Sequence, residues 1–331
     1  MENSEHPPLE TPSSTTTLPW LRVRWQLVVK ILLWLVAFFI LGVAVFSYGI
    51  YRVRWQNPTV STITKVLPFP AAMVNWRIVS LYEFNSRFDA YKKAITYNQD
   101  YDFSDPKNTD DIHKQQDALL TRMIDLKLEE QLARSRGISV SSDEVDRELE
   151  TIAVQAQVDP SNLDDLVNNI YGWSRQQFIA NVVIPQIRER KLQQAVASDV
   201  TLNADALARA QDVLQQITAG GDFAKLAEQY SDDPSSKPQG GDLGWNPSGA
   251  FVTEFEDAVS RLEIGKTSDL VTTQFGYHIV QVLGRTGEGT ADAKTHVRHI
   301  LIATKPFTDW LAQQTEQSKV WKFPVICSTI T

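Results

Sequence analysis

An uninterrupted apolar stretch near the N-terminus constrains this chain more than any other feature. Residues 31–51, ILLWLVAFFILGVAVFSYGIY, carry no charged side chain. A run of about 20 apolar residues is long enough to cross the hydrocarbon core of a bilayer as a helix. Aromatic residues stand at or near both ends, as in interfacial belts: Trp25, Trp34, Tyr48, Tyr51 and Trp55. The sequence therefore predicts a transmembrane helix over residues 27–51.

A cleaved signal peptide is the alternative interpretation of this stretch. Its apolar core would be shorter and would end in small residues at a cleavage site. The stretch ends instead in Tyr51, with Arg52 and Arg54 close behind, which favours an anchor. Basic residues flank the span on both sides, so the positive-inside bias toward a cytoplasmic N-terminus is slight.

Length, charge and cysteine content exclude several classes of protein. The 331 residues leave room for about two domains. A net charge of −8 argues against a nucleic-acid partner, because phosphate binding needs a concentrated basic surface. Cys327 is the only cysteine, so neither an internal disulfide nor a thiolate metal cluster can form.

The first half of the chain has a helical pattern. Residues 1–26 predict a disordered tail rich in Ser, Thr and Pro, and residues 52–72 predict a linker. Over residues 73–200 we expect a helical domain, with Pro185 kinking or dividing its last helix. Its helix boundaries are marked by a C-cap glycine and two capping boxes, at Gly137, Ser141–Glu144 and Ser174–Gln177.

The second half alternates helices, a long loop and strands. Amphipathic patterns predict helices over residues 204–217 and 222–230. The turn-rich loop SDDPSSKPQGGDLGWNPSG follows over residues 231–249, and loops of such length inside a domain tend to be functional. A helix over residues 251–262 and two strand-like segments, SDLVTTQ and YHIVQVLG, come next. A third strand-like segment, THVRHILI, arrives late, at residues 295–302.

These motifs resemble two known families. DFAKLAEQYSDDPSSKPQGGDLGW, FVTEFEDAV and IGKTSDLVTTQFGYHIVQVLGR are similar, in order and spacing, to a parvulin-type peptidyl-prolyl isomerase domain over roughly residues 204–285. The helical half, with LLTRMIDLKLEEQLARSRGISVSSDEVDRELE and YGWSRQQFIANV, is similar to the N-terminal chaperone region of SurA- and PrsA-like foldases. The resemblance implies an α+β protein with an all-α chaperone domain and a four-stranded antiparallel sheet surrounded by helices.

The late strand departs from the parvulin pattern. Parvulin domains begin with a central strand bearing a His-Ile-Leu signature, but residues 198–203 read SDVTLN, and VRHILI stands at the C-terminal end. We interpret the domain, residues 201–305, as circularly permuted, with its central strand at 296–302. A hairpin centred near Glu288 and Gly289 would then set His278 roughly opposite His299. A truncated second parvulin copy and an unrelated strand are the alternatives.

The resemblance implies a site in which no covalent chemistry occurs and no cofactor is needed. The catalytic network would consist of Asp233, His278, His299 and Thr273. The proline cup and cleft would be lined by Leu243, Phe251, Phe255 and Phe275, with Tyr277 lining or supporting the cleft. A metal is not expected, because His296 and His299 are three apart on a strand and point to opposite faces. A serine hydrolase is not expected either, because the sequence has no G-x-S-x-G motif.

The resulting hypothesis is a single-pass membrane protein whose soluble domains lie outside the cytoplasm. It would isomerise X-Pro bonds in unfolded or nascent polypeptides, with the helical half holding apolar segments. A catalytically weak holdase or peptide-binding module is the main alternative, and a scaffold for partner proteins is another. Residues 306–331 would form a C-terminal helix and tail that packs back through Trp310, Leu311 and Trp321.

Overall fold

The computed structural model describes residues 19–53, 55, 58–287, 289–290 and 292–324. They fall into two units, one reaching Val66 and including residue 324, the other covering Leu67–Phe323. Each unit is described by itself.

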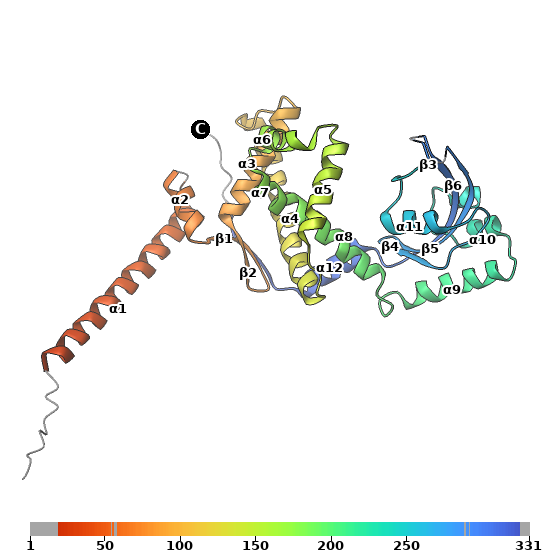
Figure 1. Cartoon of the computed structure of the whole chain (residues 1–331). Helices are drawn as coiled ribbons and strands as arrows, with labels where there is room; N and C mark the ends of the chain where they lie inside the picture. The colour runs from red at the N-terminus through yellow and green to blue at the C-terminus, as the bar shows by residue number, and fades with distance from the viewer. Residues whose placement is uncertain (1–18, 54, 56–57, 288, 291, 325–331) are drawn as a thin grey trace, which may run out of the picture. The chain divides into compact units, whose positions relative to one another are not determined.

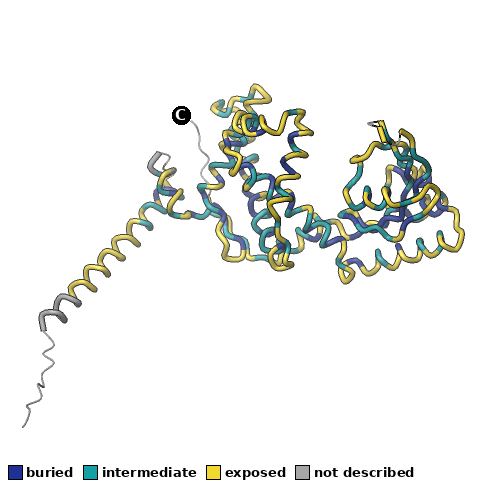
Figure 2. Tube along the Cα trace, in the orientation of Figure 1, coloured by how far each residue is buried: buried dark blue, intermediate teal, exposed yellow. Residues whose placement is uncertain are grey.

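The first unit holds the apolar stretch. Helix α1 (Pro19–Tyr48) continues into a π-helical turn, η1 (Gly49–Val53), and α2 (Pro58–Val66) follows. Among the described residues, Leu27–Val53 is the one helix long and apolar enough to cross a membrane, and Figure 2 shows most of its length exposed. The tail was expected to reach residue 26, but α1 already begins at Pro19, a residue whose fixed φ suits the first helical position. The rest of the expected tail, residues 1–18, lies outside the described residues.

The helical part of the second unit follows the cap signals in the sequence. Its main helices are α3 (Leu81–Asn98), α4 (Thr109–Ser135), α5 (Ser142–Gln155), α6 (Leu163–Tyr171), α7 (Arg175–Phe178) and α8 (Ile184–Ala197). Both expected capping boxes form, at Ser141 and at Ser174. Gly137 adopts φ 69° just after α4, and Pro185 is the second residue of α8, which directly follows a π-helical segment, η4 (Ile179–Val183). The regular α-helical pattern is therefore interrupted just before Pro185, where a kink or division was expected.

A three-stranded sheet, which the sequence did not indicate, lies beside these helices. It is formed by β1 (Pro70–Val74), β2 (Arg77–Ser80) and β7 (Val320–Lys322), in the order β2-β1-β7. These strands are too short for a period of two to stand out against the helical pattern. Helix α12 (Phe307–Gln317) precedes β7 and buries Trp310 against Leu192 and Val196 of α8. Trp321, through which this segment was also expected to pack back, lies on β7 and is 40% exposed.

The rest of the second unit is built on a four-stranded antiparallel sheet. Its strands are β3 (Asp242–Pro247), β4 (Val271–Thr273), β5 (Gly276–Thr286) and β6 (Lys294–Ala303). Their order is β3-β6-β5-β4, so β6, the last of these four strands in the sequence, is an inner strand (Figure 1). Helices α9 (Ala204–Thr218) and α10 (Phe223–Tyr230) pack on one face, and α11 (Thr253–Arg261) packs on the other.

The register of the β5–β6 hairpin differs from the expected one. His278 pairs with Leu301, and His299 pairs with Val280, so the two histidines are offset by two positions. The two histidines were expected roughly opposite each other; they are diagonal neighbours instead, because the hairpin turns near Thr290 rather than at Glu288 and Gly289. A shift of two keeps both side chains on one face, because side chains alternate with a period of two.

A buried asparagine joins the two connections between the helical part and the sheet part. Asn203 is 4% exposed, and its Nδ2 donates to the carbonyl oxygens of Val196, Ala197 and Asp199 at 2.7, 3.2 and 3.1 Å. Its Oδ1 accepts from the backbone N–H of Lys305 at 2.9 Å. One side chain therefore links the segment after α8 to the segment after β6.

Candidate active site

The loop that follows α10 is hydrogen-bonded to the late strand. The N–H of Asp232 donates to the carbonyl of Leu301 at 2.7 Å, and the N–H of Leu301 donates to Ser231 Oγ at 3.2 Å. Asp232 Oδ2 accepts from the N–H of Ala303 at 2.9 Å. These contacts fix the backbone of the next residue, Asp233, beside the middle of β6.

A glycine permits the second close approach of this loop to β6. The N–H of His299 donates to the carbonyl of Gly241 at 2.8 Å. Gly241 adopts φ 83°, and a Cβ at this position would lie 2.1 Å from the His299 carbonyl oxygen. The position therefore requires glycine both for its backbone angle and for space.

Four side chains predicted from the sequence form one continuous hydrogen-bonded chain. Thr273 Oγ1 lies 2.8 Å from His278 Nε2, and His278 Nδ1 lies 3.1 Å from His299 Nδ1. His299 Nε2 lies 2.9 Å from Asp233 Oδ2. The two imidazoles and the threonine are at least 95% buried. The structure thus brings together residues from β4, β5, β6 and the loop after α10.

With both imidazoles neutral, the form that burial favours by lowering each pKa, a single arrangement of protons satisfies every bond in this network. The Asp233 carboxylate accepts only, so His299 must donate from Nε2, which leaves its Nδ1 as an acceptor in the neutral ring. His278 must then donate from Nδ1, and its Nε2 accepts from the Thr273 hydroxyl. Thr273 Oγ1 in turn accepts from the N–H of Phe275 at 3.1 Å. In this neutral state the hydrogen bonds define the tautomer of each ring.

The Asp233 carboxylate has its acceptor positions filled. Oδ1 accepts from the N–H and the hydroxyl of Ser235 at 3.0 and 2.7 Å. Oδ2 accepts from Ser236 Oγ at 2.5 Å as well as from His299. Ser236 is 1% exposed, and its Oγ also lies 3.1 Å from His299 Nε2. Sequence reasoning missed Ser236, although its place three residues after an acidic loop residue is a common side-chain turn spacing.

The environment keeps these groups in fixed charge states. Burial lowers the pKa of His278 to about 3, with His299 adding to the effect and Asp233 opposing it. Burial also lowers the pKa of His299, and the hydrogen bond that this ring donates to Asp233 opposes the effect. Burial acts to raise the pKa of Asp233, but the hydrogen bonds from Ser236, Ser235 and His299 outweigh it and hold that pKa well below its usual range. A neutral imidazole pair therefore lies beside a permanent carboxylate.

An apolar surface borders the imidazoles. The Phe255 ring stands edge-on to His278 and His299, with centroids 5.4 and 5.8 Å away, and Phe251 packs on Phe255 at 4.8 Å. Leu243 and Phe251 are partly buried against the same cluster. Glu256 accepts from the N–H of Phe251 at 3.0 Å and so holds this loop against α11. Three of the four residues expected to bind substrate therefore belong to one apolar cluster beside the histidines, in which Phe255 is buried.

The remaining predicted residues are placed differently. Phe275 is 53% exposed and joins the network through its backbone N–H. Tyr277 does not face this site, because it packs with Ile279, Ile300 and Ile302 under α9 and α10 on the opposite face of the sheet. The interpretation that Tyr277 lines the cleft was wrong for a simple reason, since it is adjacent in sequence to His278 and side chains alternate along a strand.

The third histidine of this region has a separate role. His296 Nε2 lies 2.7 Å from Asp242 Oδ1, and its ring packs on Trp245 at 5.2 Å. Among the described residues there is no group of three or more His, Cys, Asp or Glu side chains that could hold a metal ion.

Fold and site together define a parvulin-type peptidyl-prolyl isomerase domain joined to a helical chaperone-type domain. Residues 181–286 match the model of the PPIC-type PPIase domain, a match that ends before β6. Residues 18–193, more than half of the chain, match the model of the SurA-like N-terminal domain. The chain belongs to this SurA-like family.

Curated relatives are foldases and chaperones. The Foldase protein PrsA of Caldanaerobacter subterraneus is 27% identical over 281 residues, covering 76% of this chain and 87% of that protein. Chaperone SurA of Burkholderia thailandensis is 43% identical over 120 residues, 34% of this chain and 27% of that protein. The match thus spans about a quarter of the SurA relative. Among solved structures, PrsA from Bacillus anthracis is 22% identical, with a TM-score of 0.21 over 60% of this chain and 86% of that one.

Proposed function

We propose that this protein is a membrane-anchored peptidyl-prolyl isomerase and foldase that acts on unfolded, newly translocated polypeptides. The observation that carries the proposal is the continuous hydrogen-bond network of Thr273, His278, His299 and Asp233 beside the ring of Phe255. Such a pairing of an apolar cup with a fixed polar network is what the isomerisation of an X-Pro bond requires.

The reaction needs no covalent step. Rotation about a peptide bond meets a barrier of about 18–20 kcal/mol because the C–N bond has partial double-bond character. An enzyme accelerates rotation by binding the twisted imide more tightly than the planar one, at about 1.4 kcal/mol for each tenfold gain.

We propose that each group has a part in that differential binding. Leu243, Phe251 and Phe255 would hold the pyrrolidine ring. The Asp233 carboxylate, with its acceptor positions occupied and its pKa low, is poorly suited to accept a proton or form a bond. It would act as a fixed negative charge that disfavours the charge-separated resonance form of the substrate amide.

We also propose that the isomerase domain is circularly permuted. The inner position of β6 between β3 and β5 supports this reading, as does the docking of the Ser231–Asp233 loop on β6. The alternative of an unrelated terminal strand would not account for a histidine that completes the network.

The membrane anchor is supported by the length and hydropathy of Leu27–Val53. The side of the membrane is inferred from the resemblance to SurA- and PrsA-like foldases. The resulting arrangement places the soluble domains outside the cytoplasm, where chains arrive unfolded.

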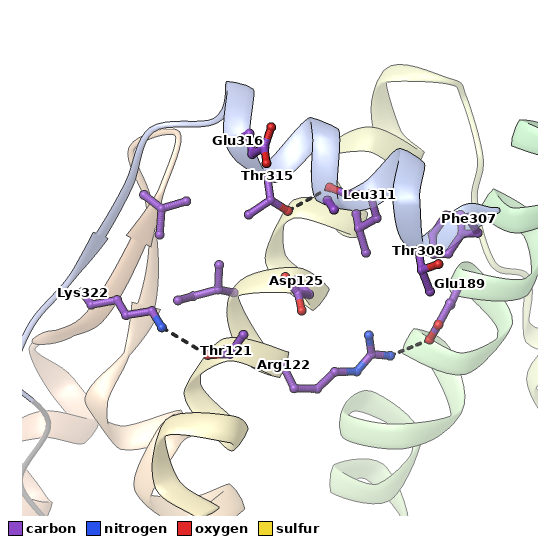
Figure 3. Close-up of a pocket in the computed structure, with 13 residues that line it drawn as sticks. Thr121, Arg122, Asp125, Glu189, Phe307, Thr308, Leu311, Thr315, Glu316 and Lys322 are labelled. Carbon is purple, nitrogen blue, oxygen red and sulfur yellow. Dashed lines mark hydrogen bonds and ion pairs between the residues drawn. The ribbon is translucent and has the colours of Figure 1, made fainter. Parts of the chain in front are cut away.

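A holdase activity with little turnover is the second candidate, favoured by a pocket in the helical part (Figure 3). The pocket has a volume of about 610 Å³ and lies between α4, α8, α12 and β7. Its apolar residues are Ile124, Phe307, Leu311, Ala312 and Val320, and charged residues rim it. Such a surface suits an extended segment with apolar side chains.

A prolyl-peptide isomerisation assay on the full chain in lipid nanodiscs tests the proposal. Asp233→Ala and His299→Ala should each remove most of the rate, whereas His296→Ala and Asp257→Ala, outside the network, should not. Suppression of aggregation of an unfolded protein should survive Asp233→Ala. Unchanged isomerisation in both network variants would contradict the mechanism and leave the holdase function.

A further inference from the structure

The turn between β1 and β2 holds an exposed tryptophan in an unusual backbone conformation. Val74 pairs with Arg77, so Asn75 and Trp76 form a two-residue turn, with φ 47° and 67°. Turns with positive φ at both central residues favour Asn followed by Gly. Trp76 stands where glycine is preferred, and its side chain is 70% exposed. The geometry of the turn therefore does not require a tryptophan at this position.

The turn is held firmly by its first residue. The N–H of Asn75 donates to the Lys319 carbonyl, and Asn75 Oδ1 accepts from the N–H of Lys319, both at 2.9 Å. Asn75 Nδ2 donates to Gln131 Oε1 at 3.2 Å and to Ser318 Oγ at 3.3 Å. Trp76 is therefore presented by a fixed backbone.

Trp76 belongs to a larger apolar surface on this sheet. Met73 pairs with Ile78 on β2 and with Trp321 on β7, so these three side chains lie in a row on one face. Ile78 and Trp321 are 37% and 40% exposed, and the Trp321 ring lies 4.9 Å from that of Trp76. We call Trp76, Ile78 and Trp321 the tryptophan face.

The tether to the proposed anchor limits how far this surface can move from a bilayer. Residues 54–69 join the apolar span to β1, and nine of them form α2. Even if every residue outside α2 were fully extended, the connection could reach no further than roughly 40 Å. Tethering at that range gives a high effective concentration, so weak contacts with the headgroup region suffice.

We propose that the tryptophan face is a second membrane contact, which lays the helical part of the protein on the lipid headgroups. Tryptophan favours the bilayer interface because its ring is apolar and its N–H is polar. The inference rests on the proposed function, since it needs the span to be an anchor.

Spin labelling of the full chain in nanodiscs tests this contact. Cys327→Ser removes the only cysteine, and Ile78→Cys then carries a nitroxide on the tryptophan face. In nanodiscs of phosphatidylcholine and phosphatidylglycerol, its accessibility to oxygen relative to a nickel chelate should be several-fold higher than for a label at Val154→Cys. Val154 is a matched control, since it is an apolar residue of α5 that is 74% exposed.

Loss of the tryptophans should release the contact without unfolding the protein. Trp76→Gly with Trp321→Ser should return the label at position 78 to the aqueous level seen at position 154. Trp76→Gly alone should keep or raise Tm, because glycine suits the turn. A large fall in Tm would show that Trp76 serves the fold and would overturn the inference.

Two further outcomes separate this inference from the proposed function. A nitroxide at Phe39→Cys should be more accessible to oxygen than to the nickel chelate, as a label in lipid is. A label at position 39 that is exposed to water would overturn the anchor and this inference together. Lipid exposure at position 39 with an aqueous label at position 78 would overturn the membrane contact alone. Burial of position 78 only after an unfolded polypeptide is added would assign the tryptophan face to peptide binding and overturn the proposal.

Discussion

His278 and His299 meet through their Nδ1 atoms at 3.1 Å, although they are two positions apart in the register of β5 and β6. Their rings lie nearly parallel, with centroids 5.3 Å apart. Diagonal neighbours on one face of a sheet are within reach of long and aromatic side chains. The contact depends on both strands, so the network can exist only when β6 has joined the sheet.

Thr273→Val should weaken the network while keeping the shape of the buried side chain. The valine cannot donate to His278 Nε2 or accept from Phe275, so we expect a loss of about 1–3 kcal/mol in stability. The isomerisation rate should fall about tenfold or more if the network stabilises the transition state by a similar free energy. ¹⁵N shifts of His278 should show a changed tautomer balance. Thr272→Val, on the other face of the same strand, is the control and should leave rate and shifts unchanged.

Gly241→Ala should be far more damaging than a glycine substitution in an open turn. The new methyl group would overlap the His299 carbonyl oxygen, so β6 and the loop that follows α10 must move apart. We expect a loss of more than about 3 kcal/mol from overpacking and backbone strain together. Gly249→Ala has a similar φ of 85° but no atom within 4 Å, and should cost only about 1–2 kcal/mol. Equal melting temperatures for the two variants would contradict the proposed close approach.

Stability of the isomerase domain should fall as pH decreases from about 6.5 toward 3. The buried His278 has a folded-state pKa of about 3, whereas in the unfolded chain it binds a proton near pH 6.5. The unfolded state therefore takes up more protons in this range, and unfolding becomes more favourable as pH falls. The depressed pKa of Asp233 acts in the same direction below about pH 4. Denaturant titrations between pH 7 and pH 4 measure how steeply the free energy of unfolding changes with pH.

A His278→Gln variant is the control for this pH dependence of the free energy of unfolding. Glutamine cannot take up a proton, so the variant should be less stable at pH 7 but should lose less stability on acidification. An identical slope in both proteins would mean that other groups cause the acid sensitivity.

Removal of residues 286–331 should unfold the second half of the chain, because it deletes the inner strand of the four-stranded sheet. Circular dichroism should show the loss of a cooperative transition, and isomerisation should cease. Removal of residues 325–331 alone leaves β6, α12 and β7 in place and is the matched control. A protein lacking residues 286–331 that melts cooperatively and keeps its activity would refute the assigned role of β6.

Local signals in the sequence predicted much of the fold. The capping boxes at Ser141 and Ser174 and the interruption just before Pro185 depend on a few neighbouring residues, and each formed as expected. The contacts among Asp233, His278, His299 and Thr273 were also expected, because the motif resemblance carried information about distant strands.

Features that depend on exact geometry escaped prediction. The hairpin register depends on where the loop turns, and the bulge between Val282 and Gly284 adds a further offset that alternation does not reveal. Ser236 gains its importance from a backbone path that places its hydroxyl between a carboxylate and an imidazole. The β1–β2 strands are short, and their third partner, β7, lies at the other end of the chain.

The pairing of β1 with β7 sets an order of assembly for a polypeptide that emerges from its N-terminus. Every strand of the four-stranded sheet has emerged by Ala303, whereas α12 and β7 come only afterwards. The isomerase sheet can thus close while β1 still lacks its partner on one side and Leu192 still lacks the cover of Trp310. During biogenesis, the catalytic half would be the first to mature, and the chaperone half would be sealed by the last helix and strand to arrive.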